Sequence, residues 1–454
     1  MPDLTRTSAG RLAAAVRRGE TTAVEVAEAH LRAVAASDGD LHAFVDLDAE
    51  RVLAGASAVD ARRSAGHRLG PLAGVPVSVK DNVDVAGEVT ACCSPAAGVV
   101  PAVRDARVVA ALRAADAVLL GRTNMDELAM GASTRTSRAL ATRNPHDRRR
   151  SPGGSSGGAA VCVAAGMATL AVGTDTGGSV REPASQCGVV GMAPSPGLVP
   201  LDGVVPFAPR LDRVGPLGRS VADVRRLLHV LAGSPGPGGL PRPRDVRSLR
   251  VGILDELSGQ VNQPGVLRCF DGVLDVLVDL GVDVVRVLVP EGPRGLAAYM
   301  SLTSAACVPV LEPWVATGRA GEEVVRRVAL GRELLGTVAG QAELDRAEGV
   351  RRRLRLQVAR ALQHCDVLLS PTMPTTAPLL FGELSAEELA DPMAAPYTDC
   401  WTVVANLTGL PALSVPAGPS RTDGMPVGVM LTGAAGSDAT LLRLGASVEA
   451  ALAR

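Results

Sequence analysis

The chain contains 454 residues, of which 47% are hydrophobic and 20% charged, and its formal net charge is −1. A nearly balanced, dispersed charge gives no electrostatic basis for tight binding to nucleic acid or to an anionic membrane. No apolar run reaches the roughly 18 residues of a membrane helix, and the N-terminus has no signal-peptide pattern. We therefore expect a soluble, cytoplasmic protein whose partner is a small molecule.

The cysteine pattern favours reduced thiols. Eight cysteines are scattered along the chain, with Cys92 and Cys93 adjacent and no CxxC pair. In a large cytosolic chain such residues are expected to be reduced core residues. No spacing typical of metal ligands occurs, so we expect neither a metal nor a cofactor.

Three helices are predicted in the first 65 residues. Ser8 and either Thr21 or Thr22 precede apolar residues at helical spacing and are candidate N-caps. A third helix is expected over residues 48–64. We expect these helices to pack on the outside of the core that follows.

An apolar run over residues 72–79 predicts a buried strand that ends at Lys80, before Asp81 and Asn82. A lysine at the tip of a buried strand loses hydration, so its pKa falls and it can accept a proton near neutral pH. Lys80 is therefore a candidate general base.

A helix is predicted over residues 106–114 and a strand over residues 117–124. Asp126 and Glu127, which follow, are expected to serve turns and capping. Ser133 is a candidate contact to a substrate.

Two loops combine glycine and serine. Residues 151–158 read SPGGSSGG, and residues 173–188 read GTDTGGSVREPASQCG. Glycines this dense let the backbone approach a ligand closely and turn its N–H groups toward one point, as is needed to hold an oxyanion. Ser155 or Ser156 in the first loop and Ser179 in the second are candidate nucleophiles.

A serine nucleophile needs a base within hydrogen-bond reach. His229 and His364 lie in helical patterns and His146 lies in a polar loop, so none has catalytic surroundings. Lys80 is the better candidate.

The second half of the chain predicts further α/β structure. Residues 233–245 form a Pro/Gly linker. Beyond it, strands at residues 249–257 and 282–290 flank a helix near residues 265–280, which indicates a βαβ unit. A last helix begins at Ala439.

Three motifs together resemble the amidase signature family: VSVKDN with Lys80, GGSSGG with Ser155 and GTDTGGS with Ser179, in the family's order and spacing. The resemblance runs from about Leu4 to the C-terminus. It implies a single large α/β domain over residues 1–454, with a mixed central β-sheet covered by helices on both faces.

Four regions are expected within that domain. They are N-terminal helices at residues 1–65, a catalytic core at 66–232, an inserted α/β region at 246–360 and a C-terminal return to the core at 366–454.

The resemblance also implies an amidase that hydrolyses a linear carboxamide through a serine acyl-enzyme. Ser179 would be the nucleophile, Ser155 a bridging serine after a cis peptide bond, and Lys80 the base. The oxyanion hole would comprise backbone N–H groups of Thr176, Gly177 and Gly178, together with that of Ser179 itself.

Several residues would contact the substrate. Arg327 and Asp399 match the residues that, in the glutamyl-tRNA amidotransferase A subunit branch, hold the carboxylate and the amino group of glutamine. A guanidinium fork suits a carboxylate and an aspartate accepts from an ammonium. Tyr299 is expected to join them, and Glu182 to border the pocket where relatives often have glutamine.

Two functions remain open. The first is a hydrolase of linear carboxamides, monomeric or homodimeric, whose substrate has a glutamine- or glutamyl-like head. The alternative is the glutaminase (A) subunit of a tRNA-dependent amidotransferase, which delivers ammonia to a partner subunit; the motif TNMDELAMGAST at residues 123–134 favours it. The chain departs from that branch at two places. Arg135 stands where the branch has glutamate, and residues 193–203, which contain no tyrosine, stand where the branch has a tyrosine-containing sequence.

Residues 154–158 also fit the GxSxG elbow of α/β-hydrolases, which would make Ser156 the nucleophile. That elbow needs a strand directly before it, whereas RRRSPG precedes these residues.

Overall fold

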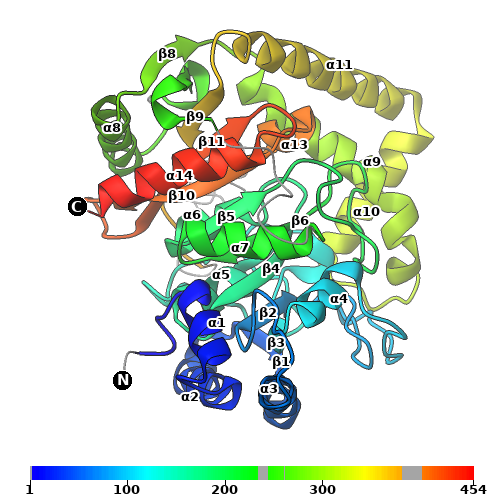
Figure 1. The fold of residues 1–454 in the computed structure, drawn as a ribbon. Helices are drawn as coiled ribbons and strands as arrows, with labels where there is room; N and C mark the ends of the chain where they lie inside the picture. The colour runs from blue at the N-terminus through cyan, green and yellow to red at the C-terminus, as the bar shows by residue number, and fades with distance from the viewer. Residues whose placement is uncertain (1–2, 234–243, 260, 381–400, 454) are drawn as a thin grey trace.

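An eleven-stranded mixed sheet forms the centre of the molecule (Figure 1). The computed structural model describes residues 3–233, 244–259, 261–380 and 401–453. The strand order is β1-β3-β2-β4-β6-β5-β10-β11-β9-β7-β8. The strands are β1 (Phe44–Asp46), β2 (Pro76–Lys80), β3 (Val118–Thr123), β4 (Leu170–Asp175), β5 (Val190–Ala193), β6 (Arg213–Gly218), β7 (Arg250–Leu254), β8 (Asp283–Val287), β9 (Val367–Pro371), β10 (Ala412–Pro419) and β11 (Pro426–Gly433).

Parallel pairing is confined to the two sides of the sheet. Strand β2 pairs in parallel with β3 and β4, and β7 pairs in parallel with β8 and β9. The strands between these sets, and β1 at the edge, pair antiparallel. The predicted mixed sheet in one large α/β domain is therefore confirmed.

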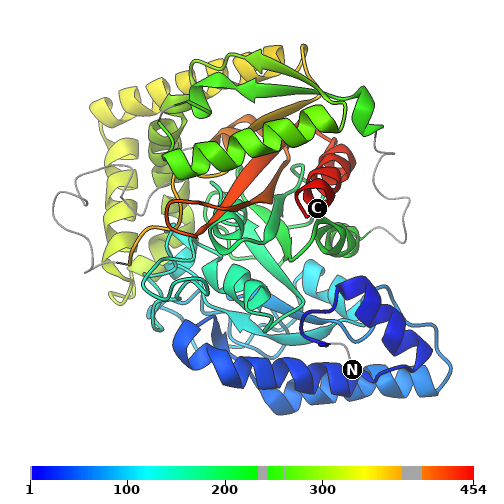
Figure 2. The ribbon, with the colours of Figure 1, turned by 90° about the vertical axis from the view of Figure 1, so that its left-hand side faces the viewer.

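Helices cover both faces of the sheet (Figures 1 and 2). They are α1 (Ala9–Arg18), α2 (Ala23–Leu41), α3 (Ala49–Ser64), α4 (Arg107–Ala114), α5 (Gly157–Ala164), α6 (Arg181–Cys187), α7 (Val221–Leu231), α8 (Pro264–Asp279), α9 (Gly295–Val315), α10 (Glu322–Gly336), α11 (Val338–Ala361), α13 (Val403–Thr408) and α14 (Asp438–Leu452).

The alternation of side chains along β10 shows how the two faces are filled. Leu413 and Val415 point to α14, where Gly445 leaves room for them. Ser414 points to the opposite face, toward Ser185 of α6 across Gly428. Because successive strand residues face opposite ways, one strand supplies both the α14 core and the α6 side, which carries the candidate site.

The predicted N-terminal helices are confirmed together with their caps. The Ser8 side chain accepts from the backbone N–H of Arg11 at the start of α1. Thr22 and Glu25 form a reciprocal capping box at the start of α2, which makes Thr22 the cap. Asp48 caps α3.

The predicted βαβ unit is also confirmed. Strand β7, helix α8 and strand β8 follow one another, and β7 and β8 pair in parallel. They extend the same sheet at its end (Figure 1). Most of the predicted linker at residues 233–245 lies outside the described residues.

Helices α9, α10 and α11 pack together beside α13 in a second apolar core. Residues 292–315, which include α9, are long and apolar enough to cross a membrane, with a mean hydropathy of 1.2. This corrects the expectation that no segment reaches that length. The helix buries Tyr299, Cys307 and Leu311 against its neighbours, so its apolar character serves this core.

Candidate active site

Strand β2 brings Lys80 to the centre of the site. The side chain is fully buried, and its Nζ donates to Ser155 Oγ at 2.8 Å, to Ser156 Oγ at 2.8 Å and to Thr174 Oγ1 at 3.0 Å. Burial lowers the pKa of Lys80 to about 7, although the negative charges of Asp126 and Asp175 oppose this shift. A neutral amine is therefore available near neutral pH.

The first glycine loop carries Ser155 to this amine. The peptide bond between Gly154 and Ser155 is cis. A Cβ on Gly154 would collide with the Asp126 carboxylate, so the loop requires glycine there. Asp126 in turn accepts from the backbone N–H groups of Ser133 (3.1 Å) and Thr134 (2.8 Å). Its expected role in turns is confirmed.

The second glycine loop carries Ser179, which follows β4. The backbone N–H of Ser156 donates to the carbonyl of Ser179 at 3.2 Å and so joins the two loops. Ser155 is fully buried, whereas 6% of Ser179 is exposed. Within the described residues the Ser179 hydroxyl has no hydrogen-bond partner, so it is not bonded to Ser155 in this state. Of the three candidate serines, Ser155, Ser156 and Ser179, only Ser179 keeps some exposed surface.

The backbone before Ser179 is anchored by two side chains. Thr176 Oγ1 donates to Asp212 at 2.6 Å, and Thr402 Oγ1 donates to the carbonyl of Gly177 at 2.6 Å. Among the described residues, the N–H groups of Gly177 and Gly178 have no acceptor. These donors are fixed in position and unused, as an oxyanion hole requires.

A buried ion pair stabilises the same segment, residues 175–181. Asp175 and Arg181 are both fully buried and lie 2.9 Å apart. Asn406 of α13 donates to Asp175 at 2.9 Å and accepts from Arg181 at 2.5 Å. Burial opposes ionisation of Asp175, but the Arg181 charge and these hydrogen bonds outweigh it and lower its pKa to about 2. Asp175 precedes Ser179 in the sequence and Arg181 follows it, so the ion pair joins the two ends of the short segment that contains Ser179.

Tyr299 and Arg327 lie along α9 and α10. A Cβ on Gly177 would lie 2.6 Å from the Tyr299 hydroxyl, so the tyrosine ring packs directly on the oxyanion segment. Arg327 is 4% exposed and donates to Ser304 Oγ at 2.6 Å and to Thr303 Oγ1 at 2.8 Å. No carboxylate lies within 4 Å of it among the described residues. Its expected partner in the site, Asp399, lies outside those residues.

Ser133 and Glu182 are the remaining predicted contacts. Ser133 is 6% exposed, and its carbonyl accepts from Ser151 Oγ at 3.1 Å beside the first glycine loop. Glu182 is fully buried on α6 and accepts from Gln186 Nε2 at 3.2 Å. Its side chain does not reach solvent, and its contact with a substrate stays a prediction.

The sequence did not single out three side chains that the structure brings to the site: Thr174, Asn82 and Thr402. One of these carried a usable signal. Thr174 belongs to the GTDTGGS motif and ends an apolar run, as Lys80 does. Nothing local indicates Thr402, which lies 225 positions from Gly177.

The α/β-hydrolase alternative does not fit the arrangement around Ser156. Its hydroxyl donates to the Thr174 carbonyl at 3.1 Å and accepts from Lys80. Ser156 is fully buried, and the described residues immediately before it form no strand. A nucleophile elbow requires both a preceding strand and an exposed hydroxyl.

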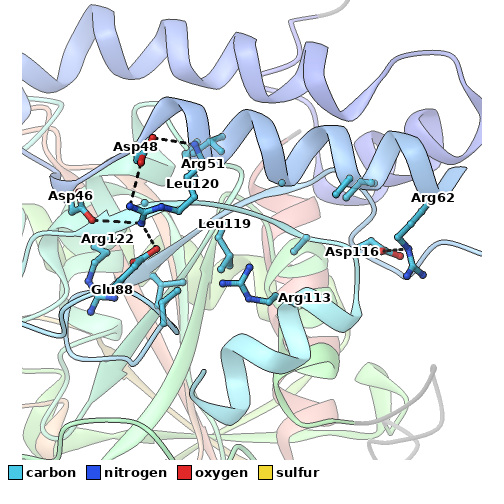
Figure 3. A pocket seen from close by; sticks show the side chains of 18 residues that line it. Asp46, Asp48, Arg51, Arg62, Glu88, Arg113, Asp116, Leu119, Leu120 and Arg122 are labelled. Atoms are coloured by element: carbon cyan, nitrogen blue, oxygen red, sulfur yellow. Dashed lines mark hydrogen bonds and ion pairs between the residues drawn. The ribbon is translucent and has the colours of Figure 1, made fainter. Parts of the chain in front are cut away.

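A separate cavity of about 260 Å³ lies between α3 and β3 (Figure 3). At one end, Arg51 donates to Glu88 at 2.5 Å, and Glu88 accepts from Arg122 at 3.3 Å. Arg122 also donates to Asp81 at 2.7 Å. A chain of ion pairs therefore connects this surface to the residue that follows Lys80.

The described residues include no group of three or more His, Cys, Asp or Glu side chains that could hold a metal ion. The seven cysteines among them are all free thiols. The groups gathered at the site are a lysine amine, several hydroxyls and backbone N–H groups.

The chain is similar to known proteins over nearly its whole length. The sequence model of the family described as Amidase matches residues 25–442. The A subunit of glutamyl-tRNA(Gln) amidotransferase from Acidothermus cellulolyticus is 42% identical, over 99% of this chain and 95% of that protein. A solved structure described as an amidase superposes with a TM-score of 0.86 at 32% identity, covering 98% of this chain and 99% of the other. The structure of the corresponding A subunit from Thermotoga maritima gives a TM-score of 0.80 at 31% identity, covering 99% of this chain and 95% of the other.

Proposed function

This chain belongs to the amidase signature family and acts on amide C–N bonds, and from that premise we propose that it cleaves a linear carboxamide through an acyl-enzyme on Ser179. Lys80 serves as the base and Ser155 carries the proton between them. The observation that supports this most strongly is the fully buried Lys80 amine, 2.8 Å from Ser155 Oγ. A desolvated lysine in direct contact with a hydroxyl is suited to proton transfer.

The proposed reaction balances its protons within the site. As Ser179 Oγ bonds to the amide carbon, its proton passes to Ser155, whose own proton passes to Lys80. The N–H groups near Gly177 and Gly178 receive the oxyanion, each contributing about 3 kcal/mol when well aimed. The C–N bond then breaks, and the same relay returns a proton to the departing nitrogen. Water releases the acyl group by the reverse route.

A second candidate function is the glutaminase (A) subunit of a tRNA-dependent amidotransferase. The relatives favour it over a free-standing amidase, because proteins with that name match over nearly their whole length. Arg327 supports the glutamine-like head in either case: it is a buried cation with hydroxyl partners and no neighbouring carboxylate among the described residues. Under this candidate the ammonia passes to a partner subunit, whereas the first function needs none. Both are proposed for the cytoplasm.

Amine or ammonia release from a panel of amides tests the chemistry. The panel includes glutamine, glutamyl amides and simple carboxamides. We expect Ser179→Ala and Lys80→Met to abolish turnover of any hit, and Ser156→Ala to retain a measurable part. Full activity in Ser179→Ala would contradict the proposal.

Co-purification from a source that contains the other amidotransferase subunits separates the two candidates. A stable complex, with glutaminase activity only in that complex, supports the second candidate. Robust amide hydrolysis by the isolated chain supports the free-standing amidase.

A further inference from the structure

The buried amine of Lys80 is surrounded by hydroxyls rather than by a counter-ion. Its three hydrogen-bond partners, at 2.8 to 3.0 Å, are the side chains of Ser155, Ser156 and Thr174. No carboxylate bonds to it within the described part of the chain. Within hydrogen-bond distance the site therefore meets a positive charge on this amine with neutral oxygens, while the carboxylates of Asp126 and Asp175 act on it only from farther away.

We propose that Thr174 and Ser156 are positioning residues that stabilise the ammonium formed on Lys80 during catalysis, and that Asn82 orients Thr174 for this task. The inference rests on the proposed function, in which Lys80 takes the proton that Ser155 passes on.

The number of donors and acceptors supports this role. An ammonium has three N–H donors and no acceptor, and burying one without partners is costly. When the proton arrives, one N–H can point to each of the three hydroxyl oxygens. Without Thr174 and Ser156, only Ser155 would remain as an acceptor, and two N–H donors of the buried ammonium would lose their partners.

Neutral acceptors suit a base that changes its charge in every cycle. A carboxylate in direct contact would favour the ammonium strongly and keep Lys80 protonated. Hydroxyl oxygens stabilise the ammonium less, so the amine can both accept and return a proton near neutral pH. This agrees with a pKa that burial lowers to about 7.

The hydrogen bonds behind the two hydroxyls fix their roles. Ser156 donates its proton to the Thr174 carbonyl at 3.1 Å, so its oxygen acts as the acceptor, both from the Thr174 backbone N–H at 3.3 Å and from Lys80 at 2.8 Å. Asn82 Nδ2 donates to Thr174 Oγ1 at 3.1 Å and restricts the rotation of that hydroxyl. Asn82 is 2% exposed, and its Oδ1 is buried with no partner in the described residues. A buried orphan oxygen costs stability, so the position of Asn82 is better explained by its contact with Thr174 than by fold stability.

Thr174→Val tests the proposal because valine keeps the shape and removes the hydroxyl. With a substrate that the unaltered enzyme turns over, kcat and KM are measured from pH 5 to 9. We expect kcat to fall about 10- to 100-fold with KM within about twofold, since one hydrogen bond to a charged group is lost. The acidic limb of the profile, where kcat declines with falling pH, should move to lower pH because the ammonium loses an acceptor. Thr174→Ser, which keeps a hydroxyl, should restore both kcat and the position of this limb.

Matched variants make the result decisive. Thr169→Val removes another buried hydroxyl, one that bonds to His30 rather than to the site, and should leave kcat unchanged. Asn82→Ala should shift the limb in the same direction as Thr174→Val. If Thr174→Val does not fold, Ser156→Ala serves as the second variant with the same expected shift.

The outcomes separate this inference from the proposed function. An unchanged kcat and acidic limb in Thr174→Val, or in Ser156→Ala where the first does not fold, overturns the inference. Activity that survives Lys80→Met overturns the proposed function itself. If Lys80→Met is inactive while Thr174→Val has a normal rate and pH profile, the proposed function stands and only the role of Thr174 is contradicted.

Discussion

The hydroxyl of Thr176 donates a hydrogen bond of 2.6 Å to the carboxylate of Asp212. The same carboxylate accepts from the backbone N–H of Phe207 at 2.9 Å and of Ala208 at 3.0 Å. Asp212 therefore joins the loop before β6 to the first residue of the segment that leads to Ser179. An aspartate can do this because both of its oxygens accept.

Asp212→Asn replaces one of those acceptors with an amide group. We expect kcat to fall about tenfold, because a small displacement of Thr176 misaligns the oxyanion donors, while KM changes little. Steady-state kinetics on any confirmed amide substrate check this. Asp202→Asn is a suitable control, since Asp202 pairs with Arg107 on the surface. Equal kinetics in the two variants would remove Asp212 from the positioning of the oxyanion segment.

The pH dependence of activity should follow Lys80. The amine acts as a base only when neutral, and burial lowers its pKa to about 7. We therefore expect kcat/KM to fall as the pH drops below about 7 and to level off above it. A pH profile from 5 to 9 measures this limb. A profile that stays flat down to pH 5 would instead indicate a base of much lower pKa, such as a carboxylate, and would contradict the assignment of Lys80.

Local sequence patterns were sufficient for much of the fold and for candidates at all three positions of the proposed triad. Ser8, Thr22 and Asp48 begin their helices as caps because capping depends on residues three positions apart. Lys80 was recognisable because it ends an apolar strand. The glycine-rich loops indicated Ser179 and either Ser155 or Ser156. Both signals come from adjacent residues.

The supporting contacts could not be predicted because tertiary packing makes them. Thr176 and Asp212 are 36 positions apart in the sequence, and Thr402 and Gly177 are 225 positions apart. These pairs meet only because β4 pairs with β6, and because α13, whose Asn406 bonds to Asp175, lies at the end of β4. No periodicity in the chain encodes such a pairing, which is why the environment of Ser179 emerged only from the structure.

Arg327 should determine the affinity for substrates that carry a carboxylate. Its guanidinium is held by Thr303 and Ser304, so a bound carboxylate would meet a preoriented fork. We expect Arg327→Met to raise KM about 10- to 100-fold for a carboxylate-bearing amide, with little effect on neutral amides. Arg332→Met on the same helix is the control, because Arg332 pairs with Glu312 at the surface. Equal losses on both substrate types would indicate a structural role for Arg327.

The buried pair of Asp175 and Arg181 should matter more for stability than any surface ion pair. Removing one partner leaves the other charge buried and uncompensated, so we expect Asp175→Asn and Arg181→Met each to lower the free energy of unfolding by about 3–5 kcal/mol. The double variant should lose less than the sum, because no lone charge remains. Denaturant unfolding at pH 7 measures all three.

The stabilisation that this pair gives to the folded protein should decrease at acidic pH. The pKa of Asp175 is about 2 in the folded protein and near 3.8 otherwise, so its contribution is complete above about pH 4 and is lost as the pH falls through 2. The difference between the unaltered protein and Asp175→Asn should therefore persist at pH 5. The exposed pair of Glu343 and Arg346 provides the control, since breaking it should cost no more than about 1 kcal/mol. Additive losses in the double variant would mean that the two buried charges are not coupled.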